Sequence, residues 1–144
     1  MIVTIDTNVM YQALQSSKGA SFAILQLIRK RDIQLALSVP VFKEYQDVLS
    51  RKKSVKDFDL NIEDVNKFIR FIAYISKTFD IYFLLRPNLK DEKDNMLLEL
   101  AVTSQSEFLI TNNIKHFEHS ELKFELPVII TPGEFLKKWR QNNV

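Results

Sequence analysis

The chain opens with MIVTIDTN, residues 1–8. Residues 2–5 are all β-branched, which favours a strand, and three of the four are apolar enough to be buried. Asp6, Thr7 and Asn8 come next, and side chains of these types hydrogen-bond the backbone at turns and helix starts. The opening therefore predicts a short buried strand that ends in a polar turn, with a carboxylate directly at its end.

The rest of the chain alternates between helical and strand-like segments. Apolar spacing and capping residues predict five helices, over residues 20–30, 40–50, about 62–77, from Asp91 through Ala101, and about 132–141. Short apolar runs predict four more strands, over residues 34–38, 79–85, 107–111 and 127–131. Five short strands separated mostly by helices indicate an α/β fold with a largely parallel sheet covered on both faces.

Length and composition set limits on the class of protein. The chain has 144 residues, of which 46% are hydrophobic, so we expect a single packed domain over residues 1–144. It has no cysteine, no apolar run of membrane-spanning length and no secretory signal in residues 1–5, so we expect a soluble, cytoplasmic protein without a membrane partner.

The net charge of +2 does not by itself indicate a polyanionic partner. A basic run at residues 51–56 fits either solvated surface or a phosphate contact.

Polar residues gather at one edge of the predicted sheet, where ligands of open α/β sheets bind. Asp6 ends the first strand, Glu44 lies in the helix after the second, Asp94 opens the helix after the third, and Asn112 and Asn113 follow the fourth. Each acid taken alone also fits a structural role, as a turn former, a helix-start charge or a solvated residue. Together, three crowded carboxylates repel each other unless a cation neutralises them, and hard oxygen ligands suit Mg²⁺ or Mn²⁺.

Glu44 fits a purely solvated role worst. Val41 and Val48 lie three residues before it and four after it, which places its carboxylate on the apolar stripe of its helix. A carboxylate placed there needs a partner.

Other kinds of site lack support in the sequence. The two glycines, Gly19 and Gly133, allow neither a dinucleotide fingerprint nor a phosphate-binding loop. The two histidines, His116 and His119, are spaced for a metal, but no third strong zinc ligand accompanies them. No set of nucleophile, base and orienting residue is visible.

These residues match a known family in their order and spacing. The chain resembles PIN-domain proteins and, within them, the VapC-like ribonucleases that act as toxins of toxin–antitoxin pairs. The resemblance spans nearly the whole chain. It rests on five segments: VTIDTNV at residues 3–9, SVPVFKE at 38–44, DEKDNMLLELA at 91–101, LITNN at 109–113 and TPGEFL at 131–136.

The resemblance implies a Rossmann-like sheet, an acidic site with one or two Mg²⁺ or Mn²⁺ ions, single-stranded RNA as substrate, an antitoxin partner and frequent homodimers. Asp6, Glu44 and Asp94 fall on the family's metal-site acids, and Thr7 or Asn8 on the polar neighbour of the first. Asn113 departs from the pattern, because the family usually has an aspartate there. Asp91 would compensate for that missing charge in part, and Thr111 is expected to support the site.

The expected reaction is metal-assisted hydrolysis of a phosphodiester. Asp6 would be the central metal ligand, Asp94 would complete the ligand set, and Glu44 would bind metal or position the attacking water. Asn113, with Thr7 or Asn8, would orient these ligands. Lys93, Lys115 and the run at residues 51–56 are candidates for contacts with the RNA phosphates.

Two alternatives stay open at this point. The chain is either the enzyme just outlined or a degenerate PIN-like module that binds RNA or a protein without cutting, for which Asn113 is the evidence. A structure-specific DNA nuclease on the same fold is a third possibility, but the chain lacks the arch and long insertions of such enzymes.

Overall fold

The computed structural model describes residues 1–82, 91–118 and 127–143. Within these residues the strands are β1 Ile2–Ile5, β2 Gln34–Leu37, β3 Lys77–Thr78, β4 Phe108–Ile110 and β5 Val128–Ile130. The α-helices are α1 Thr7–Gln15, α2 Ala20–Arg29, α3 Val39–Leu49, α4 Lys52–Phe58, α5 Ile62–Ile75, α6 Glu92–Thr103 and α7 Pro132–Asn142, and a short 3-10 helix, η1, spans Ile114–Phe117. None of the helices in these ranges has the length and apolar character that a membrane crossing requires.

The strands form one parallel sheet in the order β3-β2-β1-β4-β5. From β1 the chain first builds outward through β2 and β3, and then returns to the other side of β1 with β4 and β5. The direction of construction therefore reverses between β1 and β4, which is where open parallel sheets form their ligand-binding crevice. The predicted parallel α/β sheet is confirmed.

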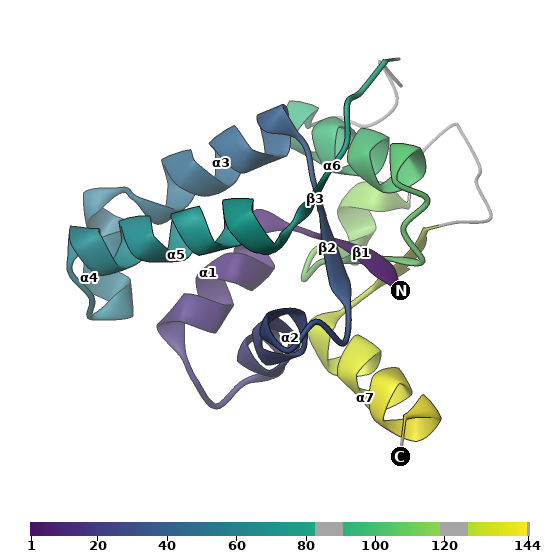
Figure 1. Cartoon of the computed structure of the whole chain (residues 1–144), viewed down its shortest axis with the longest axis horizontal. Helices are drawn as coiled ribbons and strands as arrows, with labels where there is room; N and C mark the ends of the chain where they lie inside the picture. The colour runs from purple at the N-terminus through teal and green to yellow at the C-terminus, as the bar shows by residue number, and fades with distance from the viewer. Residues whose placement is uncertain (83–90, 119–126, 144) are drawn as a thin grey trace.

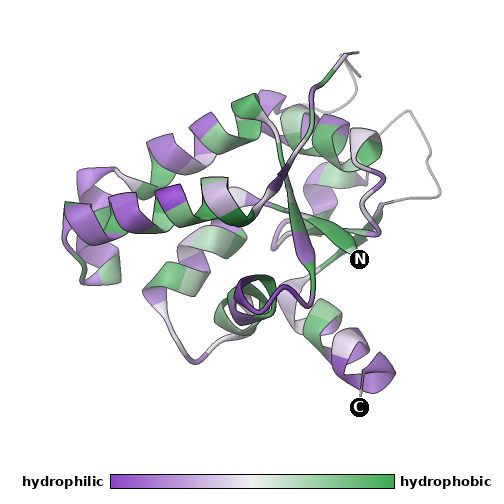
Figure 2. Cartoon of the chain, viewed as in Figure 1, coloured by the Kyte–Doolittle hydropathy of each residue, from purple (hydrophilic) through white to green (hydrophobic). Residues whose placement is uncertain are grey.

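Helices cover both sides of the sheet. Figure 1 shows α3 and α6 on one side of the strands and α2 and α7 on the other. Helix α6 contacts β1, β2 and β4, and α2 packs against α7. On α5 the apolar stripe predicted by its period of 3.6 is buried at Val65, Ile69, Ile72 and Ile75, and Figure 2 shows its hydrophilic residues on the outside.

Side chains cap four of the five predicted helices, near the starts that the sequence indicated. In each case the side chain of the capping residue accepts a hydrogen bond from a backbone N–H in the first turn. The caps are Ser38 on α3 (3.4 Å), Asn61 on α5 (2.8 Å), Asp91 on α6 (2.9 Å) and Thr131 on α7 (3.3 Å). Such caps satisfy donors that have no partner within the helix. The four helices therefore begin within a residue or two of their predicted positions.

The predicted strand over residues 79–85 is wrong where the structure describes it. The third strand is Lys77–Thr78 instead, residues 79–82 are not strand, and 83–85 lie outside the described residues. The reason is that α5 ends at Ile75 and the chain pairs at once with Ala36 and Leu37 at the edge of the sheet. An edge strand with exposed side chains lacks the apolar pattern that a sequence reading looks for.

Two α-helices and the short 3-10 helix were not predicted. Helix α1 begins at the polar turn after β1, with Asp6 at its N-cap, and buries Val9, Met10 and Ala13. Helix α4 contains most of the basic run at residues 51–56, and its side chains Ser54 and Phe58 are buried. It ends at Asp59, which adopts a left-handed backbone conformation.

Candidate functional site

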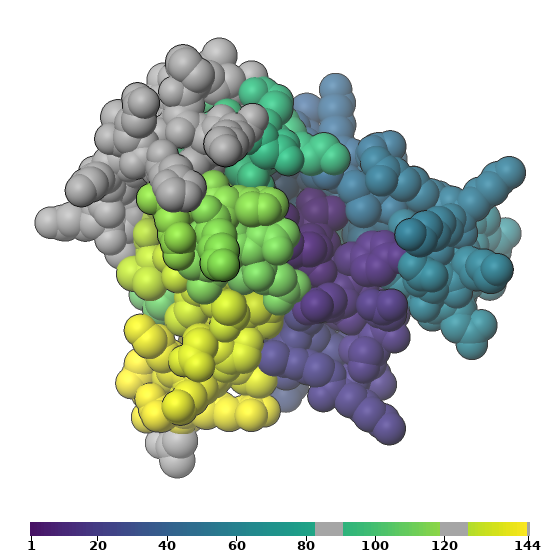
Figure 3. Space-filling model, turned by 180° about the vertical axis from the view of Figure 1, so that it is seen from behind, coloured from purple at the N-terminus to yellow at the C-terminus, as the bar shows by residue number. Residues whose placement is uncertain are grey.

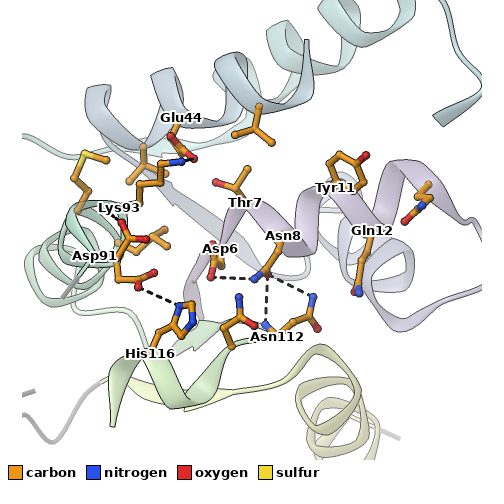
Figure 4. Close-up of a pocket in the computed structure, with 17 residues that line it drawn as sticks. Asp6, Thr7, Asn8, Tyr11, Gln12, Glu44, Asp91, Lys93, Asn112 and His116 are labelled. Carbon is orange, nitrogen blue, oxygen red and sulfur yellow. Dashed lines mark hydrogen bonds and ion pairs between the residues drawn. The ribbon is translucent and has the colours of Figure 1, made fainter. Parts of the chain in front are cut away.

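A hollow of about 510 Å³ lies at the carboxyl ends of β1 and β4, where the strand order reverses. Figure 4 shows the side chains that line it. The structure brings together there most of the site residues proposed from the sequence: Asp6, Thr7, Asn8, Glu44, Asp91, Asp94 and Asn113. Thr111 does not line the hollow but lies fully buried behind it. Four separate segments of the chain therefore supply one polar cleft.

Asp6 is the most strongly held of the acids. Only 8% of the residue is exposed, and its Oδ2 accepts a hydrogen bond from the Thr111 hydroxyl at 2.7 Å and another from Asn8 Nδ2 at 3.3 Å. Burial raises the pKa of Asp6 above its usual value, while the hydrogen bonds from Thr111 and from the backbone of Thr7 and Asn8 lower it. The net effect is a carboxylate whose charge is destabilised and which gains from a nearby cation.

Thr111 links the ends of the two central strands. Its hydroxyl donates to Asp6 and accepts the backbone N–H of Asn113 at 3.0 Å. The neighbouring Asn112 donates through its backbone N–H and its side-chain amide to Asn8 Oδ1, both at 3.4 Å. The segment after β4 is thereby tied to the start of α1, and Asn113 is placed at the rim of the hollow.

Tyr45 is a supporting residue that the sequence reading missed. It is fully buried on α3, and its hydroxyl donates to the carbonyl oxygen of Ile5, the residue before Asp6. Burial, together with the negative charge of Asp6, raises the pKa of Tyr45, so the phenol stays neutral and remains a donor. The only hint in the sequence is its position next to Glu44 on an apolar helix stripe.

Asp94 shows the strongest sign of crowded negative charge. Its pKa is raised to about 6, first by its burial and then by the negative charges of Asp6 and Asp91. His116, on η1, opposes this shift, with its Nδ1 lying 3.2 Å from Asp94 Oδ2. The structure thus places His116 at the acidic site, whereas the sequence considered it only as half of a zinc pair with His119. His119 lies outside the described residues.

Glu44 has a partner of a different kind from the metal that the sequence suggested. Its side chain is 17% exposed, and its Oε1 lies 3.5 Å from Nζ of Lys93 on α6. The prediction that this carboxylate needs a partner therefore agrees with the structure, in which the cation is a lysine. Figure 4 shows the two side chains meeting across the top of the hollow.

The donor set fits a divalent cation in part. Asp6 and Asp94 are buried carboxylates with raised pKa values, and hard oxygen ligands in such a setting suit Mg²⁺ or Mn²⁺. Glu44 is already neutralised by Lys93. In the ranges 1–82, 91–118 and 127–143, no three acidic or histidine side chains are grouped closely enough to form a metal site as they stand. The ion pair between Lys93 and Glu44 would have to break before Glu44 could bind a metal ion together with Asp6 and Asp94.

The far end of the hollow is uncharged. Tyr11 and Gln12 line this end, and Figure 4 shows both on the side away from the acids. The Tyr11 hydroxyl donates to Asp57, and Gln12 Oε1 accepts from the Ser21 hydroxyl at 3.2 Å. The cleft is therefore acidic at one end and neutral at the other.

A parallel α/β sheet with paired carboxylates at its switch point is consistent with a family assignment by sequence. The PIN domain family model matches residues 2–115, and the chain belongs to the PIN domain family. PIN domains are generally nucleases and use divalent metals. Comparison with curated proteins finds no match.

The fold is also similar to that of a solved structure, VapBC2 from Rickettsia felis bound to a DNA fragment from their promoter. The two chains share 18% identity, the match covers 91% of this chain and 98% of the other, and the TM-score is 0.63. At this identity the similarity concerns the fold. The family and fold class predicted from the sequence are confirmed.

Proposed function

We propose that the chain is a Mg²⁺- or Mn²⁺-dependent endoribonuclease that cleaves single-stranded RNA and acts as the toxin of a toxin–antitoxin pair. The observation that carries the proposal is the placement of Asp6 and Asp94, two buried carboxylates with raised pKa values, at the sheet's switch point. Membership of the PIN domain family supports nuclease chemistry. The likeness to VapBC2 supports an antitoxin partner.

The residues of the cleft have distinct roles in this proposal. Asp6 and Asp94 would hold the cation, with Asp6 kept in place by Thr111 and Asn8. The bound ion would supply a nucleophile by lowering the pKa of a water molecule and would neutralise charge on the phosphate. Glu44 would either join the ligands or orient the water, and Asn113 and Thr7 would orient groups at the rim. Lys93, once released from Glu44, would contact a phosphate of the substrate.

The proposal extends to the organisation of the protein. Residues 1–144 would act as a single PIN domain, work in the cytoplasm and form homodimers. The single domain is expected from length and composition, and the cytoplasmic setting from the lack of cysteine and of a secretory signal. The homodimer is expected from the family resemblance.

A second candidate function is favoured by two observations. Asn113 carries no charge where the family usually has an aspartate. Lys93 forms an ion pair with Glu44, which leaves that carboxylate less available to a metal ion. Both features suit a degenerate PIN-like module that binds RNA or a protein without cleaving. This module would keep the fold and the cleft but would show no metal-dependent activity.

Cleavage assays would separate the two functions. The purified chain would be incubated with labelled single-stranded RNAs across a Mn²⁺ and a Mg²⁺ series, beside Asp6→Asn. Asp32→Asn is the matched control, because Asp32 is exposed and precedes β2, at the opposite edge of the sheet. We expect cleavage by the wild type and the control, and loss of cleavage in Asp6→Asn. Absence of metal-dependent cleavage by the wild type, with RNA binding retained, would establish the binding module instead.

Asn113→Asp tests the position that departs from the family pattern. The added carboxylate should tighten cation binding and raise single-turnover cleavage about tenfold, which corresponds to roughly 1.4 kcal/mol of transition-state stabilisation. The gain should be largest at limiting Mn²⁺. A fall in the rate would show that the amide of Asn113 is itself required, and a variant that stays inactive along with the wild type would favour the binding module.

A further inference from the structure

A second hollow, of about 690 Å³, lies between the start of α2 and α7. Three basic side chains line it, from Lys18, Lys137 and Arg140, and its lining contains no acidic residue. All three are exposed, and none is in an ion pair within the described part of the chain. These charges are therefore available to a ligand, and the hollow is a basic groove.

A third hollow, of about 360 Å³, connects the basic groove with the acidic cleft. It shares Gln12, Gln15 and Asn112 with the cleft. It shares Gly19, Ala20 and Gly133 with the basic groove. The three hollows therefore adjoin one another in a row, which we call the depression, from Asp6 past the start of α2 to α7. In Figure 3 the yellow surface of α7 lies beside the indigo segment that leads into α2, with the purple of α1 close by.

The chemistry along this depression changes in a way that suits a single-stranded nucleic acid. The cleft holds the acids that act on one phosphodiester, the middle offers amide and hydroxyl groups, and the far end offers three cations. A strand that leaves the cleft carries one negative charge per nucleotide, and it gains affinity wherever lysine or arginine replaces its counterions.

The basic groove is a better candidate for this contact than the basic run at residues 51–56. Arg51 in that run is already paired with Asp47 at 2.7 Å. The run lies on and beside α4, away from α7, and none of its members lines the three connected hollows. The sequence alone had drawn attention to that run because its charges are consecutive, whereas the groove assembles its charges from two distant segments.

We propose that the RNA substrate leaves the acidic cleft along this depression and that Lys18, Lys137 and Arg140 bind its phosphates several nucleotides from the cleavage point. The inference rests on the proposed ribonuclease function and adds a substrate track to it. A short RNA that fills only the cleft would not reach the basic groove, whereas a longer one would.

The test compares two triple variants on two substrates. One variant is Lys18→Ala, Lys137→Ala, Arg140→Ala, and its control is Lys30→Ala, Lys67→Ala, Arg70→Ala, which removes the same charge from exposed side chains elsewhere. The substrates are a tetranucleotide and a strand of about 16 nucleotides that contains it. We expect the groove variant to raise KM for the long strand about tenfold, with a kcat on that strand close to the wild-type value. Its kcat/KM for the tetranucleotide should be unchanged.

Salt dependence gives a second readout that a structural effect would not produce. Each phosphate contact with a single strand contributes about 0.7 to the slope of log affinity against log salt. Anisotropy titrations of the long RNA should therefore show a slope lower by about two in the groove variant, with the control variant equal to the wild type. This measurement needs no cleavage, so it tests the track even if the proposed nuclease activity fails.

Three results would overturn the track. The groove variant could bind and cleave the long strand as the wild type does, as expected if the groove serves an acidic protein instead. It could lose activity equally on both substrates. Finally, both triple variants could weaken long-strand binding alike, which would mean that overall charge, and not the groove, attracts the RNA.

Discussion

At the scale of single residues, the Thr111 hydroxyl has the most consequential position outside the cleft. It is fully buried and connects Asp6 to the segment that carries Asn113. Thr111→Val keeps the shape of the side chain and removes the hydroxyl. We expect RNA cleavage or Mn²⁺ affinity to fall roughly 10- to 100-fold, the usual cost of losing a group that orients a metal ligand.

Thr111→Ser is the matched control, because it retains the hydroxyl and loses only a methyl group. It should stay close to the wild type in both assays, and circular dichroism would verify that both variants are folded. Equal activity of the valine and serine variants would show that this hydrogen bond does not support the site.

Asp94 provides a prediction about pH and stability. Its folded-state pKa of about 6 lies above the ordinary value of 3.8, so the native protein binds a proton more tightly than the unfolded chain does. The resulting destabilisation is absent near pH 4, grows as the pH rises toward 6, and is complete above it. Without metal, Asp94→Asn should therefore be more stable than the wild type at pH 7, by roughly 1–3 kcal/mol, and nearly equal to it at pH 4.

Denaturant unfolding in the presence of a chelator, at both pH values, measures this difference. A variant that is less stable than the wild type at pH 7 would indicate that Asp94 has a structural role, through His116 for example, and that the crowding of negative charge is not what matters.

At the scale of elements, the start of α5 offers a clean test of capping. Asn61 accepts the backbone N–H of Asp64 at 2.8 Å, and Glu63 and Asp64 place negative charge in the first turn. Asn61→Ala should lower the free energy of unfolding by about 1 kcal/mol. Asn66→Ala, an exposed position in the same helix, should be neutral or slightly stabilising in the same denaturation experiment. Similar losses in both would contradict a capping role.

Elements also differ in how well their sequences predict them. Helix α5 has an apolar stripe and a capping residue, both of which are local properties, and its start was predicted to the residue. Strand β3 has two exposed residues, and its pairing with Ala36 and Leu37 is made possible by a neighbour far away in the chain. Helix α1 was missed because its first residues resemble a polar turn, and only its packing shows that the turn continues as a helix.

At the scale of the whole molecule, a cation that binds only the native state should stabilise the fold. At a concentration of about 100 times Kd, Mn²⁺ would add roughly 2.7 kcal/mol, or about 5–10 °C in Tm for a chain of this size. Thermal unfolding with and without Mn²⁺ would show this shift in the wild type and in Asp32→Asn, and a much smaller one in Asp6→Asn. A shift of the same size in all three proteins would place the cation elsewhere.

The sequence by itself determined the parallel α/β sheet, one helix start within a residue of Pro40 and three more at the caps Asn61, Asp91 and Thr131. It also determined the edge at which Asp6, Glu44 and Asp94 lie. It could do so because periodicity, capping and the order of strands and helices are properties of short segments. Strand ends in a parallel sheet then meet at one edge whatever the side chains are.

Only the tertiary structure decided which side chains meet at that edge. The pairing of Glu44 with Lys93, the hydrogen bond from Thr111 to Asp6 across 105 residues, and the contact of His116 with Asp94 join separate elements. The same holds for the basic groove, whose charges come from the turn before α2 and from α7. Such partnerships depend on how helices pack on the sheet, to within the reach of a hydrogen bond, and no local pattern in the chain records that packing.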